Sequence, residues 1–138
     1  MNTKSFLITC VVVYIVANAL GVLIHGVWLG PVYEAMEADA VFRPKAEMDP
    51  MMWVMFAVGA VWVVVFVYIF IRGREGKGLM EGVRYGVLMG LFYSLTVTFN
   101  SYVIYPIPFD LAVKWFFGDF ATVIISGVIT SLVYKPSN

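Results

Sequence analysis

Four long stretches without formal charge limit most strongly how this chain can fold. They are residues 5–33, 50–71, 85–109 and 111–134, of which only the last is interrupted, by Lys114 and Asp119. An α-helix needs about 20 apolar residues to cross about 30 Å of hydrocarbon. Backbone groups in lipid have no water to bond, and barrel strands are shorter and alternate in polarity. The stretches therefore predict membrane-crossing α-helices.

Composition and charge support the same class of protein. Of the 138 residues, 62% are hydrophobic and 13% are charged, whereas soluble domains carry about 25% charged residues. Nine basic residues balance nine acidic ones, so no basic excess indicates nucleic acid as a partner. Cys10 is the single cysteine, which excludes an intramolecular disulfide.

We therefore predict an all-α integral membrane four-helix bundle that forms a single transmembrane domain over residues 1–138, with the lipid bilayer as its partner. Helices are expected at about residues 5–30, 51–71, 80–104 and 111–134. Gly30-Pro31 is expected to end the first helix. Asp49-Pro50 is expected to open the second, with Asp49 as its N-cap.

The distribution of cations predicts the orientation of the bundle. Six cations fall on the side that holds both termini and the glycine-rich turn: Lys4, Arg72, Arg74, Lys77, Arg84 and Lys135. The other side holds Arg43, Lys45 and Lys114. Because cytoplasmic loops carry an excess of Lys and Arg, we expect both termini in the cytoplasm and the 34–50 loop outside.

Polar residues follow one face of two of the predicted helices. On the first helix they are Tyr14, Asn18, Gly21, His25 and Trp28. On the fourth they are Trp115, Asp119, Thr122, Ser126 and Thr130. Spacings of three and four residues keep each set on one face, and polar groups in lipid turn toward the bundle interior. Both faces are expected to point inward.

The third helix opens with a tandem small-residue pattern, Gly82, Gly86 and Gly90. Glycines four residues apart allow two helix backbones to approach closely. The pattern predicts close helix packing, either within the chain or between two chains.

The predicted topology brings several polar residues to a similar depth near the outer ends of the helices. His25, Asn100 and Asp119 are expected to form an outward-facing polar cluster, with Tyr33 and Glu34 just above it. Asn18 and Trp28, on the same face as His25, complete the candidate ligand-binding set. An ionisable residue inside the membrane is a candidate functional site because its burial is costly.

The cluster has more than one interpretation. A His beside a carboxylate can bind a proton, a cation or a polar ligand, or it can form a hydrogen bond that only holds two helices together. One His with one or two carboxylates is a thin ligand set for a metal, and no spacing motif accompanies it. The sequence indicates no catalytic residue, and any cofactor is unknown.

The second half of the chain resembles a known group of proteins. Glu81-Gly-Val-Arg-Tyr-Gly86 and Tyr105-Pro-Ile-Pro108 are followed by Ala112, Trp115-Phe116 and Tyr134-Lys135-Pro136. His25-Gly-Val-Trp-Leu-Gly-Pro31 is similar to the end of the first helix in that group. The group consists of small uncharacterised prokaryotic four-helix membrane proteins, related in style to the DUF1761-like families. The resemblance implies the fold and a prokaryotic cytoplasmic membrane, and it implies no activity.

Four functions are compatible with these features. The first is a non-enzymatic membrane protein that binds a small polar ligand, an ion or a partner through the outward cluster. The second is a small homo-oligomeric transporter assembled through the glycine face. The third is an accessory subunit of a larger membrane complex, with the apolar second helix as its docking face. The fourth is a lipid-acting membrane enzyme in which His25 or Asp119 is the acid or base.

Overall fold

The computed structural model describes residues 1–36 and 41–137, and these residues are almost entirely helical, with no strand among them. Four helical runs are long and apolar enough to cross a membrane. They are Thr3–Trp28 (α1 Thr3–Gly21 and η1 Val22–Trp28), Lys45–Gly73 (α3 Lys45–Met48, η3 Asp49–Met51 and α4 Met52–Gly73), Leu79–Ile104 (α5 Leu79–Gly90, η4 Leu91–Leu95 and α6 Thr96–Ile104) and Phe109–Val133 (α7). The expected all-α class is confirmed.

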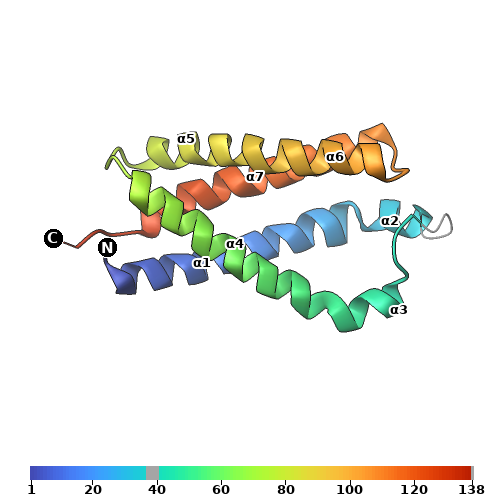
Figure 1. Ribbon diagram of the computed structural model, residues 1–138, viewed down its shortest axis with the longest axis horizontal. Coiled ribbons are helices and arrows are strands. Elements are labelled where there is room, and N and C mark those ends of the chain that lie inside the picture. The colour runs from blue at the N-terminus through green and yellow to red at the C-terminus, as the bar shows by residue number, and fades with distance from the viewer. Residues whose placement is uncertain (37–40, 138) are drawn as a thin grey trace.

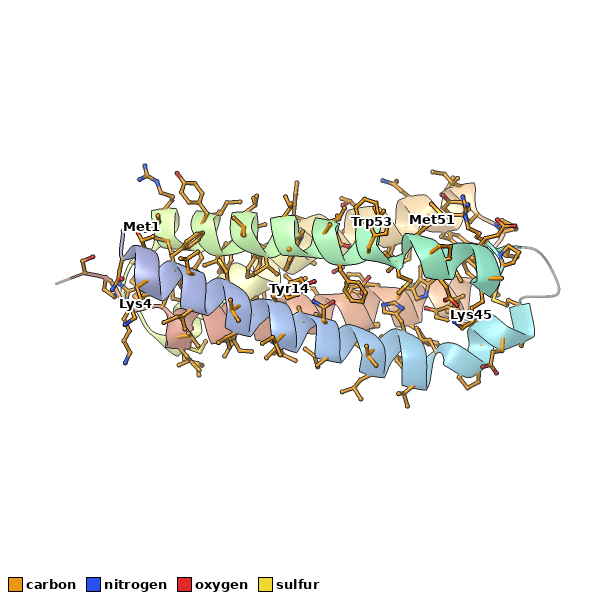
Figure 2. The ribbon with its side chains drawn as sticks, turned by 90° about the horizontal axis from the view of Figure 1, so that it is seen from below. Met1, Lys4, Tyr14, Lys45, Met51 and Trp53 are labelled. Carbon is orange, nitrogen blue, oxygen red and sulfur yellow. The ribbon has the colours of Figure 1, made fainter. Side chains whose placement is uncertain are left out.

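The long helices lie side by side and alternate in direction along one axis (Figure 1). Both termini and the turn between α4 and α5 lie at one end. The short helices α2 (Gly30–Met36) and α3 lie at the opposite end. In Figure 2, Lys4 lies near the end that holds the termini, and Lys45 lies near the opposite end. The arrangement matches an even number of crossings.

The closest packing in the molecule joins α5 to α7 through glycines. A Cβ added to Gly86 would lie 2.6 Å from Ile124 Cα, and one added to Gly127 would lie 2.5 Å from Gly82 O. A Cβ on Gly90 would lie 2.6 Å from the ring of Phe120. The tandem glycine pattern therefore packs within the chain. Its glycine face is covered by α7, so it is not available for the contact between chains that the transporter hypothesis assigned to it.

Two apolar clusters form the core: one, around Leu29 and Leu111, lies toward the end that holds α2, and the other lies in the half of the bundle nearer the termini. Val13 of α1, Val67 of α4 and Val123 of α7 meet there, and Phe66 stacks on Trp62 with ring centroids 4.7 Å apart. The other half of α4 has only exposed or half-buried side chains. Burial therefore holds α4 to the bundle at one end, and its opposite end diverges from α6 (Figure 1).

The second long helical run begins earlier than the sequence suggested. Helix starts at Lys45, directly after Pro44, and Asp49 has helical backbone angles with no capping side chain. The expectation that Asp49-Pro50 opens this helix is therefore wrong. The Lys45 ammonium lies 2.7 Å from the Asp49 carboxylate one turn away, a pairing that favours the additional helical turn.

The turn between α4 and α5 is organised by a buried carboxylate. Glu81, in the first turn of α5, is 6% exposed and accepts hydrogen bonds from the backbone N–H groups of Glu75 and Lys77. Gly76 and Gly78 have positive φ angles of 79° and 67°, a conformation that favours glycine. The Glu81 carboxylate thus satisfies two backbone N–H groups of the tight turn.

Candidate functional site

His25 lies in a π-helical segment, η1, which replaces the last turns of a regular α-helix. The backbone N–H of Leu29 bonds to the carbonyl of Ile24, five residues back, as in π-helix. The wider turn shifts the helical register. Leu29 is 1% exposed, whereas Trp28 is 54% exposed. The expectation that Trp28 shares the inward face of His25 is therefore wrong, because the spacing argument assumed a uniform α-helix.

The short helix α2 returns the chain over His25. Pro31 occupies its first turn, where the missing N–H costs little. Two residues later, the hydroxyl of Tyr33 lies 2.8 Å from His25 Nδ1. The two rings are nearly parallel, with an interplanar angle of 7°. The Gly30-Pro31 break thus places Tyr33 beside His25.

Helix α7 supplies the two other members of the site, one turn apart. Trp115 Nε1 donates a hydrogen bond of 2.7 Å to the Tyr33 hydroxyl oxygen. Asp119 Oδ1 lies 3.3 Å from His25 Nε2. The residues Trp115, Tyr33, His25 and Asp119 form one continuous hydrogen-bonded chain, which we call the Trp–Tyr–His–Asp chain.

The geometry orders the donors along this chain. Because the Tyr33 oxygen accepts from Trp115, its own hydrogen can be directed to Nδ1 of a neutral His25. Nε2–H then donates to the Asp119 carboxylate. A protonated His25 would instead donate from both nitrogens, to the phenol and to the carboxylate. The arrangement accommodates both states of the imidazole.

An aromatic side chain packs against one side of the Trp–Tyr–His–Asp chain. Phe42 meets the ring of Tyr33 edge-on at 5.7 Å and lies 6.2 Å from the ring of Trp115. Burial raises the pKa of Tyr33 to about 12; the Trp115 hydrogen bond opposes this rise, and the charge of Asp119 adds to it. Tyr33 therefore stays a protonated phenol, which donates and accepts hydrogen bonds but does not act as an anion.

The ionisable pair is only partly buried. The side chains of His25 and Asp119 are 39% and 28% exposed. His25 Nε2 is the only described group in hydrogen-bonding contact with the Asp119 carboxylate, and no described Lys or Arg pairs with it. Asp119 is thus a half-exposed carboxylate with one unengaged oxygen.

The remaining candidate residues do not take part in the Trp–Tyr–His–Asp chain. Asn100 is exposed on α6, and within residues 1–36 and 41–137 no hydrogen bond joins it to His25 or Asp119. The Asn18 amide donates to Tyr14 O in its own helix at 2.8 Å. Glu34, next to Tyr33, is exposed. The structure brings together three of the seven candidate ligand-binding residues, His25, Tyr33 and Asp119.

Sequence reasoning did not assign Trp115 and Phe42 to the site. Trp115 was placed on the same helical face as Asp119, so its spacing could have identified it. Phe42 gives no comparable signal, because it lies in the 34–50 loop and belongs to none of the predicted helices. A second π-helical segment, η4 Leu91–Leu95, was also missed.

In the part of the chain that the structure describes, no group of three His, Cys, Asp or Glu side chains could hold a metal ion. The arrangement can instead hold a proton, accept hydrogen bonds at the carboxylate, and attract positive charge.

Comparison with known proteins adds no family. No family model matches the chain, and neither a curated protein nor a solved structure matches it. The resemblance to DUF1761-like families therefore stays a prediction. The fold and the site define the class on their own: four helices apolar enough to cross a membrane, with a His–carboxylate contact between the first and the fourth.

Proposed function

We propose that this chain is a non-enzymatic multi-pass protein of a prokaryotic cytoplasmic membrane that binds a small cationic ligand from the outer side. The Asp119 carboxylate is the counter-charge, and His25 and Tyr33 position it. The observation that carries the proposal is the half-exposed Asp119 carboxylate, whose only described partner is an imidazole.

Electrostatics favours a cation over an anion. A carboxylate in a low-dielectric region attracts positive charge more strongly than it does in water. In the sequence, residues 34–50, which follow Tyr33, include five acidic and two basic residues, a net charge of −3. A field of one sign at the mouth of a site raises the local concentration of oppositely charged ligands.

The orientation rests on the cation distribution. The end that holds the termini carries six of the nine Lys and Arg residues, which favours the cytoplasmic side. The Trp–Tyr–His–Asp chain lies toward the end that holds α2, where Tyr33 is located. In this orientation the site opens outward.

Protonation of His25 provides a competitor for the ligand. A protonated imidazole would neutralise Asp119 across the 3.3 Å contact, whereas a neutral imidazole leaves the carboxylate charge to a bound cation. A cationic ligand at Asp119 and a proton on His25 would therefore compete, so that binding of either one would weaken binding of the other. If the His25–Asp119 contact only held two helices together, no such competition would occur.

Native mass spectrometry of protein released from its own membrane tests the proposal. The wild type is expected to retain a non-lipid mass that Asp119→Asn loses. Asp110→Asn is the matched control, because Asp110 is an exposed carboxylate on the same helix that pairs with Lys114 at 3.0 Å. A wild type that retains only lipid, or equal loss in both variants, contradicts the proposed ligand site.

A further inference from the structure

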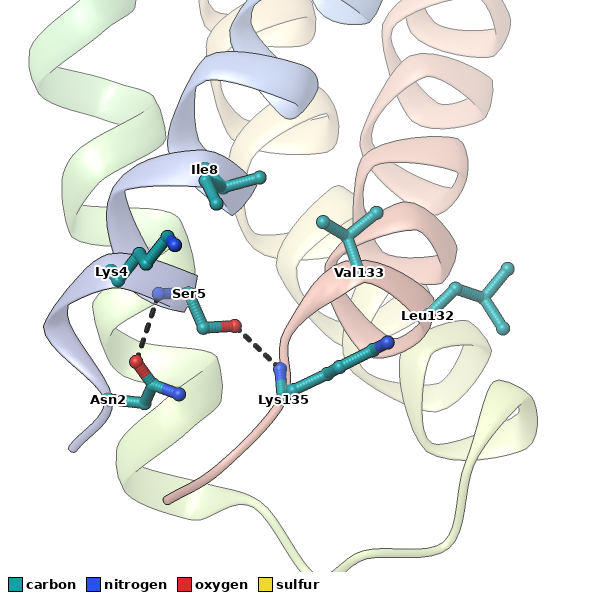
Figure 3. A pocket seen from close by; sticks show the side chains of 7 residues that line it. All are labelled: Asn2, Lys4, Ser5, Ile8, Leu132, Val133 and Lys135. Carbon is teal, nitrogen blue, oxygen red and sulfur yellow. Dashed lines mark hydrogen bonds between the residues drawn. The ribbon is translucent and has the colours of Figure 1, made fainter.

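The N-terminal and C-terminal segments line a surface cavity of about 420 Å³ (Figure 3). It lies between the first turns of α1 and the last turn of α7. Its polar rim is formed by Asn2, Lys4, Ser5 and Lys135. Its apolar wall is formed by Ile8, Leu132 and Val133. This cavity is at the opposite end of the molecule from the Trp–Tyr–His–Asp chain.

Hydrogen bonds between the termini hold the rim in place. The Lys135 backbone N–H donates to Ser5 Oγ at 2.7 Å, and the Ser5 N–H donates to Asn2 Oδ1 at 3.1 Å (Figure 3). The Asn2 N–H donates to the hydroxyl of the buried Tyr134 at 3.3 Å. The two lysines are thus attached to backbone segments that are tied to each other across the cavity.

The cavity carries positive charge that no described carboxylate balances. Within residues 1–36 and 41–137, no carboxylate lines it, and neither Lys4 nor Lys135 pairs with an acidic side chain. By contrast, Lys77 and Arg84 at the same end both pair with Glu75, at 2.5 and 3.2 Å. The cavity lysines are therefore available to an external anion.

The apolar wall indicates what kind of anion fits. Ile8 and Leu132 remain exposed, although they directly adjoin the lysines. They belong to helices long and apolar enough to cross a membrane, so the wall continues from the headgroup level toward the hydrocarbon. An inorganic anion would use the lysines alone, whereas a phospholipid would use both the lysines and the wall.

We propose that this cavity binds one anionic phospholipid, with its phosphate between Lys4 and Lys135 and an acyl chain along Ile8, Leu132 and Val133. Basic groups at the membrane surface attract anionic lipids, and aliphatic side chains bury acyl methylene groups. The site requires that the chain spans a membrane, but it is independent of ligand binding at Asp119.

Lipid retention in native mass spectrometry tests the site. The protein is placed in nanodiscs of equimolar phosphatidylcholine and phosphatidylglycerol with identical acyl chains, and the retained lipids are counted. The wild type is expected to retain phosphatidylglycerol preferentially. Lys4→Gln/Lys135→Gln should reduce this preference by about fivefold for each lysine, so about 25-fold in total.

Two further variants distinguish lipid binding in this cavity from attraction of anionic lipid to any cation at this end of the molecule. Arg72→Gln/Arg74→Gln removes two cations at the same end that do not line the cavity, and it should keep the wild-type preference. Leu132→Trp fills the cavity without changing charge and should reduce the preference, even where the double lysine variant fails to fold. Asp119→Asn should retain the lipid, which separates this result from the outer site.

Three results would overturn the proposal. The first is equal loss of preference in the lysine and arginine variants, which indicates diffuse attraction. The second is unchanged preference in both Lys4→Gln/Lys135→Gln and Leu132→Trp. The third is displacement of phosphatidylglycerol by added inorganic phosphate in the wild type, which would identify a free anion as the ligand.

Discussion

Trp115 donates a hydrogen bond to the hydroxyl of Tyr33 at 2.7 Å, across 82 residues of sequence. This contact joins the short helix α2 to the long apolar helix α7. It also fixes the phenol against His25, whose Nδ1 lies 2.8 Å away. Trp115 therefore helps to position the His25 imidazole beside Asp119 through Tyr33, although it forms no hydrogen bond with either residue.

Replacing Tyr33 by Phe tests this dependence. The variant leaves the Trp115 N–H and His25 Nδ1 without their shared partner, which is expected to cost about 1–3 kcal/mol of unfolding free energy. The matched control is Tyr105→Phe, because the Tyr105 side chain is exposed; a surface change of this kind is expected to stay within about 0.5 kcal/mol. Unfolding in detergent with increasing denaturant measures both. Equal stability of the two variants would contradict a structural role for the Tyr33 hydroxyl.

Replacing Gly86 by Ala tests the contact between α5 and α7. Because the added Cβ would lie 2.6 Å from Ile124 Cα, the helices must separate, and overpacking of this kind costs about 1–3 kcal/mol. Gly21→Ala is the control, since a Cβ there meets nothing within 4 Å. That change should be neutral or stabilising by up to about 1 kcal/mol. Thermal unfolding measures both, and a Gly86→Ala protein as stable as the wild type would show that the helices do not pack this closely.

Acid should weaken the turn between α4 and α5. Lys77 and Arg84 hold the pKa of Glu75 below its ordinary value of 4.5. A carboxyl whose pKa is lowered on folding contributes stability above its unfolded pKa and loses it as the pH falls through the folded pKa. The difference in stability between wild type and Glu75→Gln should therefore be constant at neutral pH, begin to fall near the ordinary pKa, and disappear only below the lowered pKa of the folded state. A difference that persists unchanged in acid would contradict the ion pairs.

The four-helix architecture could be predicted because it depends on lengths and on average polarity. Uncharged stretches such as 85–109 are long enough to cross a membrane whatever their detailed packing. The inward direction of Asp119 followed in the same way, since lipid offers no partner for a carboxylate. These features are local properties of the chain.

Details that depend on contacts between helices could not be predicted. The register of the π-helical segment, which buries Leu29 and exposes Trp28, is set by packing and not by composition. The same holds for the burial of Glu81, which depends on the turn whose backbone N–H groups donate to its carboxylate. Asn100 had a suitable depth, but depth does not determine which side of a helix faces the site.

The single histidine allows the central claim to be tested directly. In protein labelled with ¹⁵N-histidine and placed in nanodiscs, the ring nitrogens of His25 report on Asp119 across the 3.3 Å contact. Small ammonium ions, from ammonium to tetramethylammonium, are added at constant ionic strength. A saturable shift of the Nε2 signal in the wild type and in Asp110→Asn, absent in Asp119→Asn, is the predicted result. No shift, or a non-saturating shift equal in all three proteins, would contradict a cation site at Asp119.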